Sequence, residues 1–194
     1  MSTDSIRNPY LPTPMHVLHA YYESTDRTLK TLELSFDNPQ DSAAFFRKFN
    51  PGQFCQLSVF GKGESPIGVA SAAWEGDFVR FTVQKMGAVT KALHKLQPGD
   101  PLGMRGPLGN GFPLEAWKGK NLVIIGGGCA FSTLYALTKH VQHPQNRPDF
   151  GQIIVIYGAR SSGLCMYKHD IQSWYKREDM EVHQAIDIPE EDWT

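Results

Sequence analysis

The chain has 194 residues, 41% of them hydrophobic, and a formal net charge of −1. This composition supports a hydrophobic core in one large or two small domains and excludes wholesale disorder. Scattered lysines and arginines give nucleic-acid binding no electrostatic support, and no apolar stretch is long enough to span a bilayer. We therefore expect a cytoplasmic protein without a signal peptide, without membrane insertion and without a nucleic-acid partner.

The first half of the chain is predicted to be a β-barrel. Residues 1–15 contain three prolines and should form an extended N-terminal arm. In the domain expected over residues 16–115, alternating runs such as 32–36 and 78–84 favour a six-stranded antiparallel barrel over an open sheet. One helix, Val89–Leu96, is expected to interrupt the strands. The expected strands are His16–Glu23, Thr28–Phe36, Gln53–Phe60, Ile67–Ala73, Phe78–Lys85 and Pro101–Arg105.

The hydrophobic pattern changes between about residues 113 and 120, from mainly short strands to strands that alternate with helices. Over residues 118–194 the order β-α-β-α-β predicts a partial, three-strand Rossmann-like parallel sheet. Its first strand, Leu122–Ile125, is apolar throughout and is expected to be covered on both faces. The other expected elements are a helix around Ser132–Val141, a strand Ile153–Tyr157, a helix near Tyr167–Arg177 and a strand Glu181–Ile186.

A glycine turn follows the first parallel strand. Gly126, Gly127 and Gly128 let the backbone approach a pyrophosphate, and the helix that follows directs N–H groups toward an anion. The alternative is a tight strand-to-helix turn kept for packing alone. Three widely separated cysteines and histidines without ligand spacing predict neither a disulfide framework nor a protein-bound metal.

Five motifs occur in the order seen in the ferredoxin–NADP reductase superfamily, which the chain resembles from about residue 8 to its end. Within it, the chain most resembles the FAD/NAD-binding electron-transfer subunit of anaerobic sulfite reductase and the gamma subunit of cytoplasmic sulfhydrogenases. Two further segments, Asn8-Pro-Tyr-Leu-Pro12 and Tyr157-Gly-Ala-Arg160, strengthen that comparison. The motifs are Pro51-Gly-Gln-Phe54, Ser65-Pro-Ile67, Gly87-Ala-Val-Thr90, Gly106-Pro-Leu-Gly-Asn-Gly-Phe-Pro113 and Gly126-Gly-Gly128.

The resemblance implies an FAD site in the barrel. Gly87, Val89 and Thr90 would hold the flavin pyrophosphate at the start of a helix, the alternative being an ordinary helix cap. Pro66, Ile67 and Gly68 would press on the flavin ring. The superfamily usually has Arg-x-Tyr-Ser at this strand, so Ser65 replaces a phosphate-binding arginine, and Gly68 removes a hydroxyl that would bond the region of flavin N5.

The resemblance also implies a nicotinamide-dinucleotide site at Gly127, Gly128 and Arg160. Arg160 would meet the adenosine ribose or its phosphate, the alternative being a solvated loop arginine. Relatives tend to have Gly-Gly-x-Gly-x-Ala-Pro at the turn, where this chain has Ala130 and the pair Ser132-Thr133. The Ala130 β-carbon would crowd the pyrophosphate.

The expected function is that of a flavin-dependent oxidoreductase subunit, which accepts hydride from NAD(P)H onto FAD and passes electrons to an iron–sulfur partner. The partners would be iron–sulfur or hydrogenase/reductase-type subunits of a larger complex. The alternative is a non-catalytic assembly subunit that keeps the fold but has lost pyridine-nucleotide turnover.

Relatives continue for about another half-domain and carry a cysteine cluster there, so we expect no iron–sulfur cluster within this chain. Three explanations for the missing half-domain stay open: truncation, a second chain that completes the sheet, and loss of the segment. The sequence also leaves open whether the nucleotide is NADH or NADPH. A sheet of this size is expected to leave Ile153–Tyr157 or its neighbour at an exposed edge.

Overall fold

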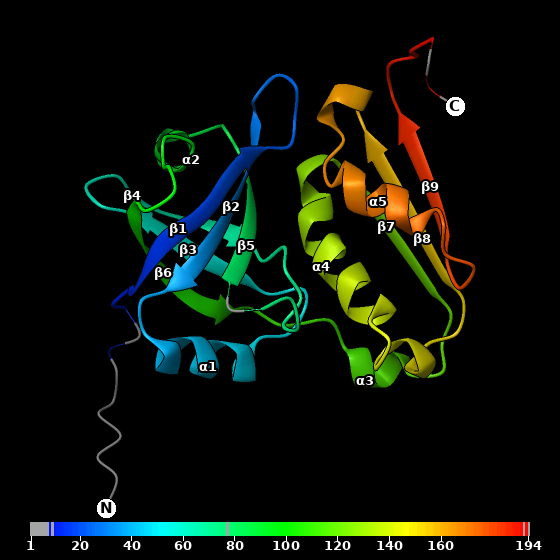
Figure 1. Cartoon of the computed structure of the whole chain (residues 1–194), viewed down its shortest axis with the longest axis horizontal. Coiled ribbons are helices and arrows are strands. Elements are labelled where there is room, and N and C mark those ends of the chain that lie inside the picture. Colours follow the sequence, from blue (N-terminus) through cyan, green and yellow to red (C-terminus); the bar gives the residue numbers. More distant parts are fainter. Residues whose placement is uncertain (1–7, 9, 77, 192, 194) are drawn as a thin grey trace, which may run out of the picture.

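The computed structural model describes residues 8, 10–76, 78–191 and 193 and contains two sheets that lie side by side (Figure 1). One is a six-stranded antiparallel sheet and the other a three-stranded parallel sheet flanked by helices. The predicted fold class is therefore confirmed. Most of the expected N-terminal arm, residues 1–7 and 9, lies outside the described residues, and the first strand already begins at Thr13.

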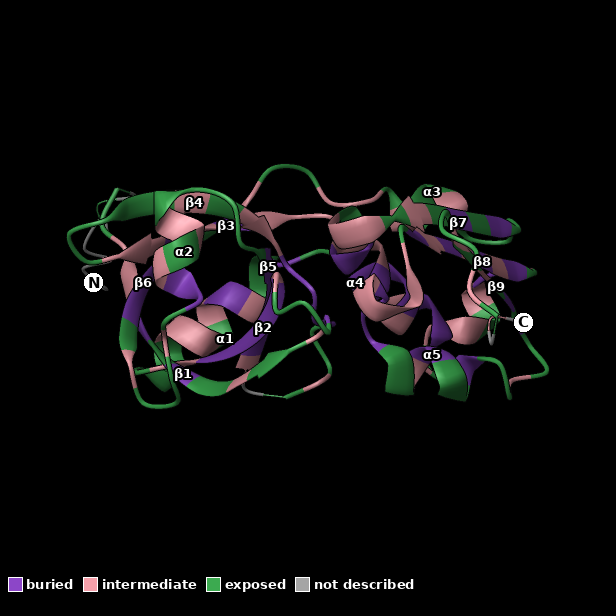
Figure 2. Ribbon diagram, turned by 90° about the horizontal axis from the view of Figure 1, so that it is seen from above, coloured by how far each residue is buried: buried purple, intermediate pink, exposed green. Residues whose placement is uncertain are grey.

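The antiparallel sheet closes into a barrel. Its strands follow the order β4-β3-β6-β1-β2-β5, and an isolated bridge between Val69 and Phe81 joins the two ends. Leu32, Leu57 and Phe81 are fully buried inside it. Buried segments, drawn in purple, run along the strands of the barrel in Figure 2. The strands are β1 (Thr13–Tyr22), β2 (Leu29–Phe36), β3 (Phe54–Val59), β4 (Gly63–Gly68), β5 (Phe78–Gln84) and β6 (Pro101–Leu108).

Two helices accompany the barrel, of which the sequence predicted only one. The missed helix is α1 (Pro39–Lys48), which buries Phe45 against the aromatic rings of Phe36 and Phe49. The expected helix is α2 (Ala88–Leu93), slightly earlier and shorter than predicted. Strand β4 also precedes the expected Ile67–Ala73, because it forms a hairpin with β3 through a tight Gly-Lys-Gly turn.

The predicted β-α-β-α-β order is confirmed in the second half. The strands β7 (Leu122–Gly127), β8 (Ile153–Ala159) and β9 (Glu181–Ile186) are all parallel, in the order β7-β8-β9. The main helices are α4 (Phe131–Gln142) and α5 (Lys168–Trp174). Short elements connect them: α3 (Leu114–Trp117) and the 3₁₀ turns η1 (Gly128–Ala130), η2 (Arg147–Asp149) and η3 (Ser162–Leu164).

Strand β7 is covered on one face only, which corrects the prediction of burial on both faces. Leu122 and Ile124 join the core formed with α4 and α5, whereas Val123 and Ile125 are 58% and 65% exposed. Both helices pack on the same side of the sheet, and no described element covers the other side. Strand β8 lies in the middle, so β7 and β9 are the edges.

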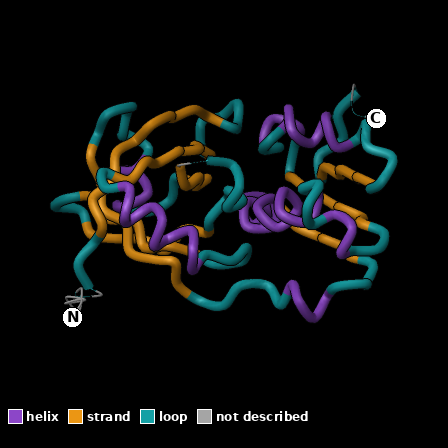
Figure 3. Tube along the Cα trace, turned by 60° about the horizontal axis from the view of Figure 1, so that its bottom comes forward, coloured by secondary structure: helices purple, strands orange, loops and turns teal. Residues whose placement is uncertain are grey.

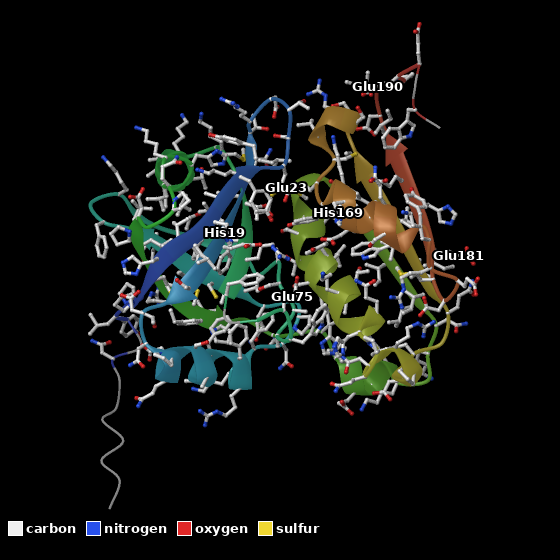
Figure 4. All side chains as sticks on the ribbon, viewed as in Figure 1. His19, Glu23, Glu75, His169, Glu181 and Glu190 are labelled. Atoms are coloured by element: carbon white, nitrogen blue, oxygen red, sulfur yellow. The ribbon has the colours of Figure 1, made fainter. Side chains whose placement is uncertain are left out.

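Helix α4 runs between the barrel and the parallel sheet (Figure 3) and carries much of the interface between them. Tyr135 of α4 accepts a hydrogen bond from Arg80 of β5 at 3.2 Å. The backbone N–H of Tyr167 donates to the Glu23 carboxylate at 2.9 Å. Figure 4 shows Glu23 and Glu75 at this boundary. Among the described helices, none is long and apolar enough to cross a membrane.

Candidate functional site

A cavity of about 560 Å³ lies where the barrel meets η1 and α4. Its volume is in the range of small-molecule and cofactor sites. The six residues predicted to contact a flavin all line it, although they come from two separate segments of the chain. The lining residues are Glu64, Ser65, Pro66, Ile67, Gly68, Thr82, Gln84, Met86, Gly87, Ala88, Val89, Thr90, Cys129, Ala130, Ser132 and Thr133.

Strand β4 forms one wall because the hairpin turn before it is made by glycines. Gly61 and Gly63 both have positive φ angles, of 71° and 96°, which glycine adopts without steric cost. Pro66 has no backbone N–H to donate, and it is tolerated because β4 is the terminal strand in the order of the sheet. The strand therefore presents Pro66, Ile67 and Gly68 to the cavity.

The start of α2 forms a second wall. Gly87 has extended backbone angles, and a β-carbon added there would meet nothing within 4 Å. The Thr90 hydroxyl oxygen accepts hydrogen bonds from the backbone N–H groups of Met86 and Gly87, both at 2.9 Å, so it holds the turn in shape. No described group accepts a hydrogen bond from the N–H groups of Ala88 and Val89.

Polar side chains that the sequence patterns did not single out complete the cavity. Thr82 and Gln84 extend from β5, and Ser132 and Thr133 from the first turn of α4. The alternation of apolar and polar residues along β5 is the sequence signal that could have identified Thr82 and Gln84. Because Val79, Phe81 and Val83 all point into the barrel, the alternate positions Thr82 and Gln84 must point outward.

The charges around the cavity are already paired. The Glu64 carboxylate forms a salt bridge with Arg105, and no lysine or arginine is among the lining residues that the structure describes. Cys129 lines the cavity and also packs against the core of the α/β part. Burial raises the pKa of its thiol, which therefore stays protonated and is a poor nucleophile.

The three glycines after β7 differ in what surrounds them. A β-carbon on Gly126 would come within 2.5 Å of Leu134, so this glycine lets α4 pack closely on the strand. Gly128 has a φ of 51° and open space around it, and the nearest atom to a β-carbon on Gly127 would be 3.8 Å away. Gly127 and Gly128 are thus free to approach a ligand.

The predicted dinucleotide residues do not line the cavity itself. Gly127 pairs with Gly158 at the carboxyl end of the sheet, and the exposed Arg160 follows two residues later at the same edge. Ligands of such sheets bind outside the carboxyl ends of the strands. Cys129 and Ala130 connect this edge to the cavity, so the two predicted sites are adjacent. Among the described residues, no cluster of three or more His, Cys, Asp or Glu side chains is positioned to hold a metal.

The molecule thus combines a closed antiparallel barrel and a parallel α/β sheet, with a cavity at their junction. Comparison with known proteins identifies this fold. The chain is 36% identical over 182 residues to sulfhydrogenase 1 subunit gamma of Pyrococcus furiosus, a match that covers 92% of this chain. It is 38% identical over 135 residues to a probable dihydroorotate dehydrogenase B (NAD(+)) electron transfer subunit of Thermococcus kodakarensis, covering 68% of this chain.

Among solved structures, the fold is similar to that of a ferredoxin–NADP+ reductase from Neisseria gonorrhoeae with bound FAD and NADP. The TM-score is 0.73 at 19% identity, and the match covers 90% of this chain and 68% of the other. No family model matches the chain. The chain is thus related in sequence to these two subunits and has the fold of the ferredoxin–NADP reductases, which confirms the resemblance drawn from its motifs. It spans 60% and 52% of the lengths of the two curated relatives.

Proposed function

We propose that the cavity holds FAD and that the chain acts in electron transfer between a pyridine nucleotide and a partner subunit. The observation that carries this proposal is the meeting of two motif segments, residues 66–68 and 87–90, on one cavity of about 560 Å³. Neither segment is specific by itself, and the sequence places them about 20 residues apart. Their convergence on one cavity supports a shared ligand.

The surroundings of the cavity fit a flavin in two respects. The N–H groups of Ala88 and Val89 have no acceptor among the described residues, and Gly87 leaves open space beside them. A pyrophosphate would satisfy those donors. Ile67 and the backbone of Pro66 and Gly68 offer an apolar surface for a planar ring. Because no described cation lines the cavity, we expect the backbone donors to carry the phosphate contact.

The carboxyl edge of the parallel sheet is where we place the pyridine nucleotide. Gly127 and Gly128 would approach its pyrophosphate, and the exposed Arg160 would meet the adenosine ribose or its phosphate. When bound, FAD would take a hydride from NAD(P)H and a proton from solvent, giving NAD(P)+, and later release two electrons singly and two protons. The chain's own residues would bind and orient the two cofactors.

We propose further that this chain works as one subunit of a complex. The relatives named above are a gamma subunit and an electron transfer subunit, and they are considerably longer than this chain. A partner with iron–sulfur clusters would accept electrons one at a time. A second candidate function is an assembly subunit without pyridine-nucleotide turnover. The Ala130 side chain favours it, because it stands at the cavity wall in a turn where glycine gives a pyrophosphate closer access.

The test is to purify the chain, load it with FAD and add NADH or NADPH under anaerobic conditions. The proposal predicts a bound flavin absorbance band that bleaches with at least one nucleotide. A flavin band that neither nucleotide bleaches would leave only the assembly function. A folded chain that takes up no FAD would refute the flavin site.

A further inference from the structure

Gly68 and Thr133 meet across the cavity, although they belong to different parts of the molecule. Gly68 ends strand β4 of the barrel, and Thr133 lies in the first turn of α4. A β-carbon built on Gly68 would overlap the Thr133 hydroxyl oxygen, and both residues line the cavity. The hydroxyl of Thr133 therefore occupies the space that any side chain at position 68 would take.

Glycine is required at position 68 because there is no room for a side chain, and not because of the backbone conformation. Gly68 is absent from the residues with positive φ, and it pairs with Phe54 in the regular β3–β4 ladder. An L-residue would adopt this backbone without strain, but its side chain would displace Thr133. A glycine inside a strand commonly marks such a close approach.

The Thr133 hydroxyl makes no hydrogen bond to any described residue. A threonine inside a helix often bonds back to the carbonyl oxygen four residues earlier. Thr138 of the same helix does so, donating to the Leu134 carbonyl oxygen at 2.9 Å. Thr133 instead has its hydroxyl at the cavity wall beside Gly68, with donor and acceptor capacity unused.

The two positions also depart together from the superfamily pattern that the sequence resembles. Position 68 lacks the serine hydroxyl usual at the flavin strand, and position 133 carries a hydroxyl where the pattern has proline. One hydroxyl is lost from the barrel, and one is gained from the α/β part at nearly the same place in space. A hydroxyl both donates and accepts, which suits a ring nitrogen that accepts a hydrogen bond when oxidised and donates one when reduced.

We propose that Thr133 supplies the hydroxyl contact to the reactive edge of the flavin ring, in place of a side chain on β4. This inference rests on the proposed flavin site. It makes Thr133 a flavin-contacting residue contributed by the helix that follows the nucleotide-binding turn. The flavin environment would then depend on how closely α4 is held against the barrel.

The test measures the flavin midpoint potential, the visible spectrum and FAD affinity in matched variants. Thr133→Val keeps the shape and removes the hydroxyl, Thr133→Ser keeps a hydroxyl, and Thr138→Val removes one that lies outside the cavity. Thr133→Val should change the two-electron equilibrium between oxidised and reduced flavin about tenfold, a change in midpoint potential of about 30 mV in either direction, with FAD still bound. Thr133→Ser and Thr138→Val should match the parent.

The double variant Gly68→Ser/Thr133→Ala moves the hydroxyl back to the barrel and should recover the parent potential. Parent-like potential and spectrum in flavin-loaded Thr133→Val would overturn the inference while leaving the flavin site intact. Failure of the folded parent to bind FAD would overturn the proposed function and this inference together.

Discussion

The hydroxyl of Thr82 on β5 lies 2.6 Å from the hydroxyl of Tyr167 at the start of α5, 85 residues further along the chain. Thr82 also hydrogen-bonds Thr31 at 2.7 Å and lines the candidate flavin cavity. One buried hydroxyl thus links the cavity wall, the barrel and the α/β part. The position of the proposed nucleotide-binding half relative to the proposed flavin site is therefore fixed by specific contacts.

Replacing Arg80 should weaken that arrangement. Its guanidinium bonds the carboxylates of Glu33 and Glu75, at 2.9 and 3.0 Å, and all three side chains are largely buried. Arg80→Met leaves two buried carboxylates short of a partner and should lower the free energy of unfolding by about 3 kcal/mol. Urea denaturation measures the loss. Arg105→Met removes an exposed ion pair with Glu64 and is the control, with a much smaller expected effect. Equal losses in the two variants would contradict this account.

Stability should fall in mild acid because of His94. Burial lowers the pKa of His94 below its ordinary value of 6.5, and nearby Lys30 and Lys85 act in the same direction, against the hydrogen bond to the Val83 carbonyl. Below about pH 6.5 the unfolded chain takes up a proton that the folded chain resists, so the free energy of unfolding decreases as pH falls. His94→Gln should flatten that decrease between about pH 6.5 and 5.

His169 is the control for His94, because its side chain is 98% exposed. His169→Gln should retain the parent's dependence of unfolding free energy on pH. A parent-like slope in His94→Gln, measured by denaturant unfolding at several pH values, would show that His94 is not responsible.

Alanine substitutions at the glycines after β7 should separate an effect on stability from an effect on nucleotide binding. Gly126→Ala places a β-carbon against Leu134 and should cost about 1–3 kcal/mol of stability. Gly127→Ala meets its nearest neighbour at 3.8 Å, so stability should hold while NAD(P)H affinity falls. Thermal unfolding and nucleotide titration of the FAD-loaded chain give the two readouts. Unchanged nucleotide affinity in Gly127→Ala would remove this residue from the proposed site.

Thr90 should affect flavin affinity through the turn it holds. Thr90→Ala deprives the N–H groups of Met86 and Gly87 of their acceptor, which loosens the start of α2. FAD affinity should drop about tenfold, the worth of one good hydrogen bond. Thr90→Ser retains the hydroxyl and should bind like the parent. If Thr90→Ala also binds like the parent, the turn is not part of the site.

Strict alternation was the most reliable guide to the fold. Strands β2 and β5 were predicted almost to their ends, because one face of each is buried in the barrel. Strand β4 was predicted too late in the sequence, because Glu64, Ser65 and Pro66 lack β propensity. The hairpin turn, rather than the hydrophobicity of these residues, sets the position of the strand. Helix α1 was missed although Asn38 caps it and Pro39 opens it, a sequence pattern typical of a helix start.

The cavity was predictable only in part. Motif order located Pro66 to Gly68 and Gly87 to Thr90, but nothing along the chain indicates that Thr133 would stand beside Gly68. That contact arises from the packing of α4 against the barrel, a relationship between residues 65 positions apart. The exposure of one face of β7 could not be predicted either, since an apolar run does not reveal which of its faces a helix covers.

The most direct test of the flavin site is an FAD titration of the parent chain and of Gly87→Phe. A side chain at position 87 meets no described atom near its β-carbon, and the backbone there is extended, so the variant should fold like the parent. The ring would nevertheless project from the cavity wall. We predict stoichiometric FAD binding by the parent, strongly reduced binding by Gly87→Phe and similar melting temperatures for both. Equal FAD affinity in the two proteins, or no binding by the folded parent, would contradict the assignment of this cavity to a flavin.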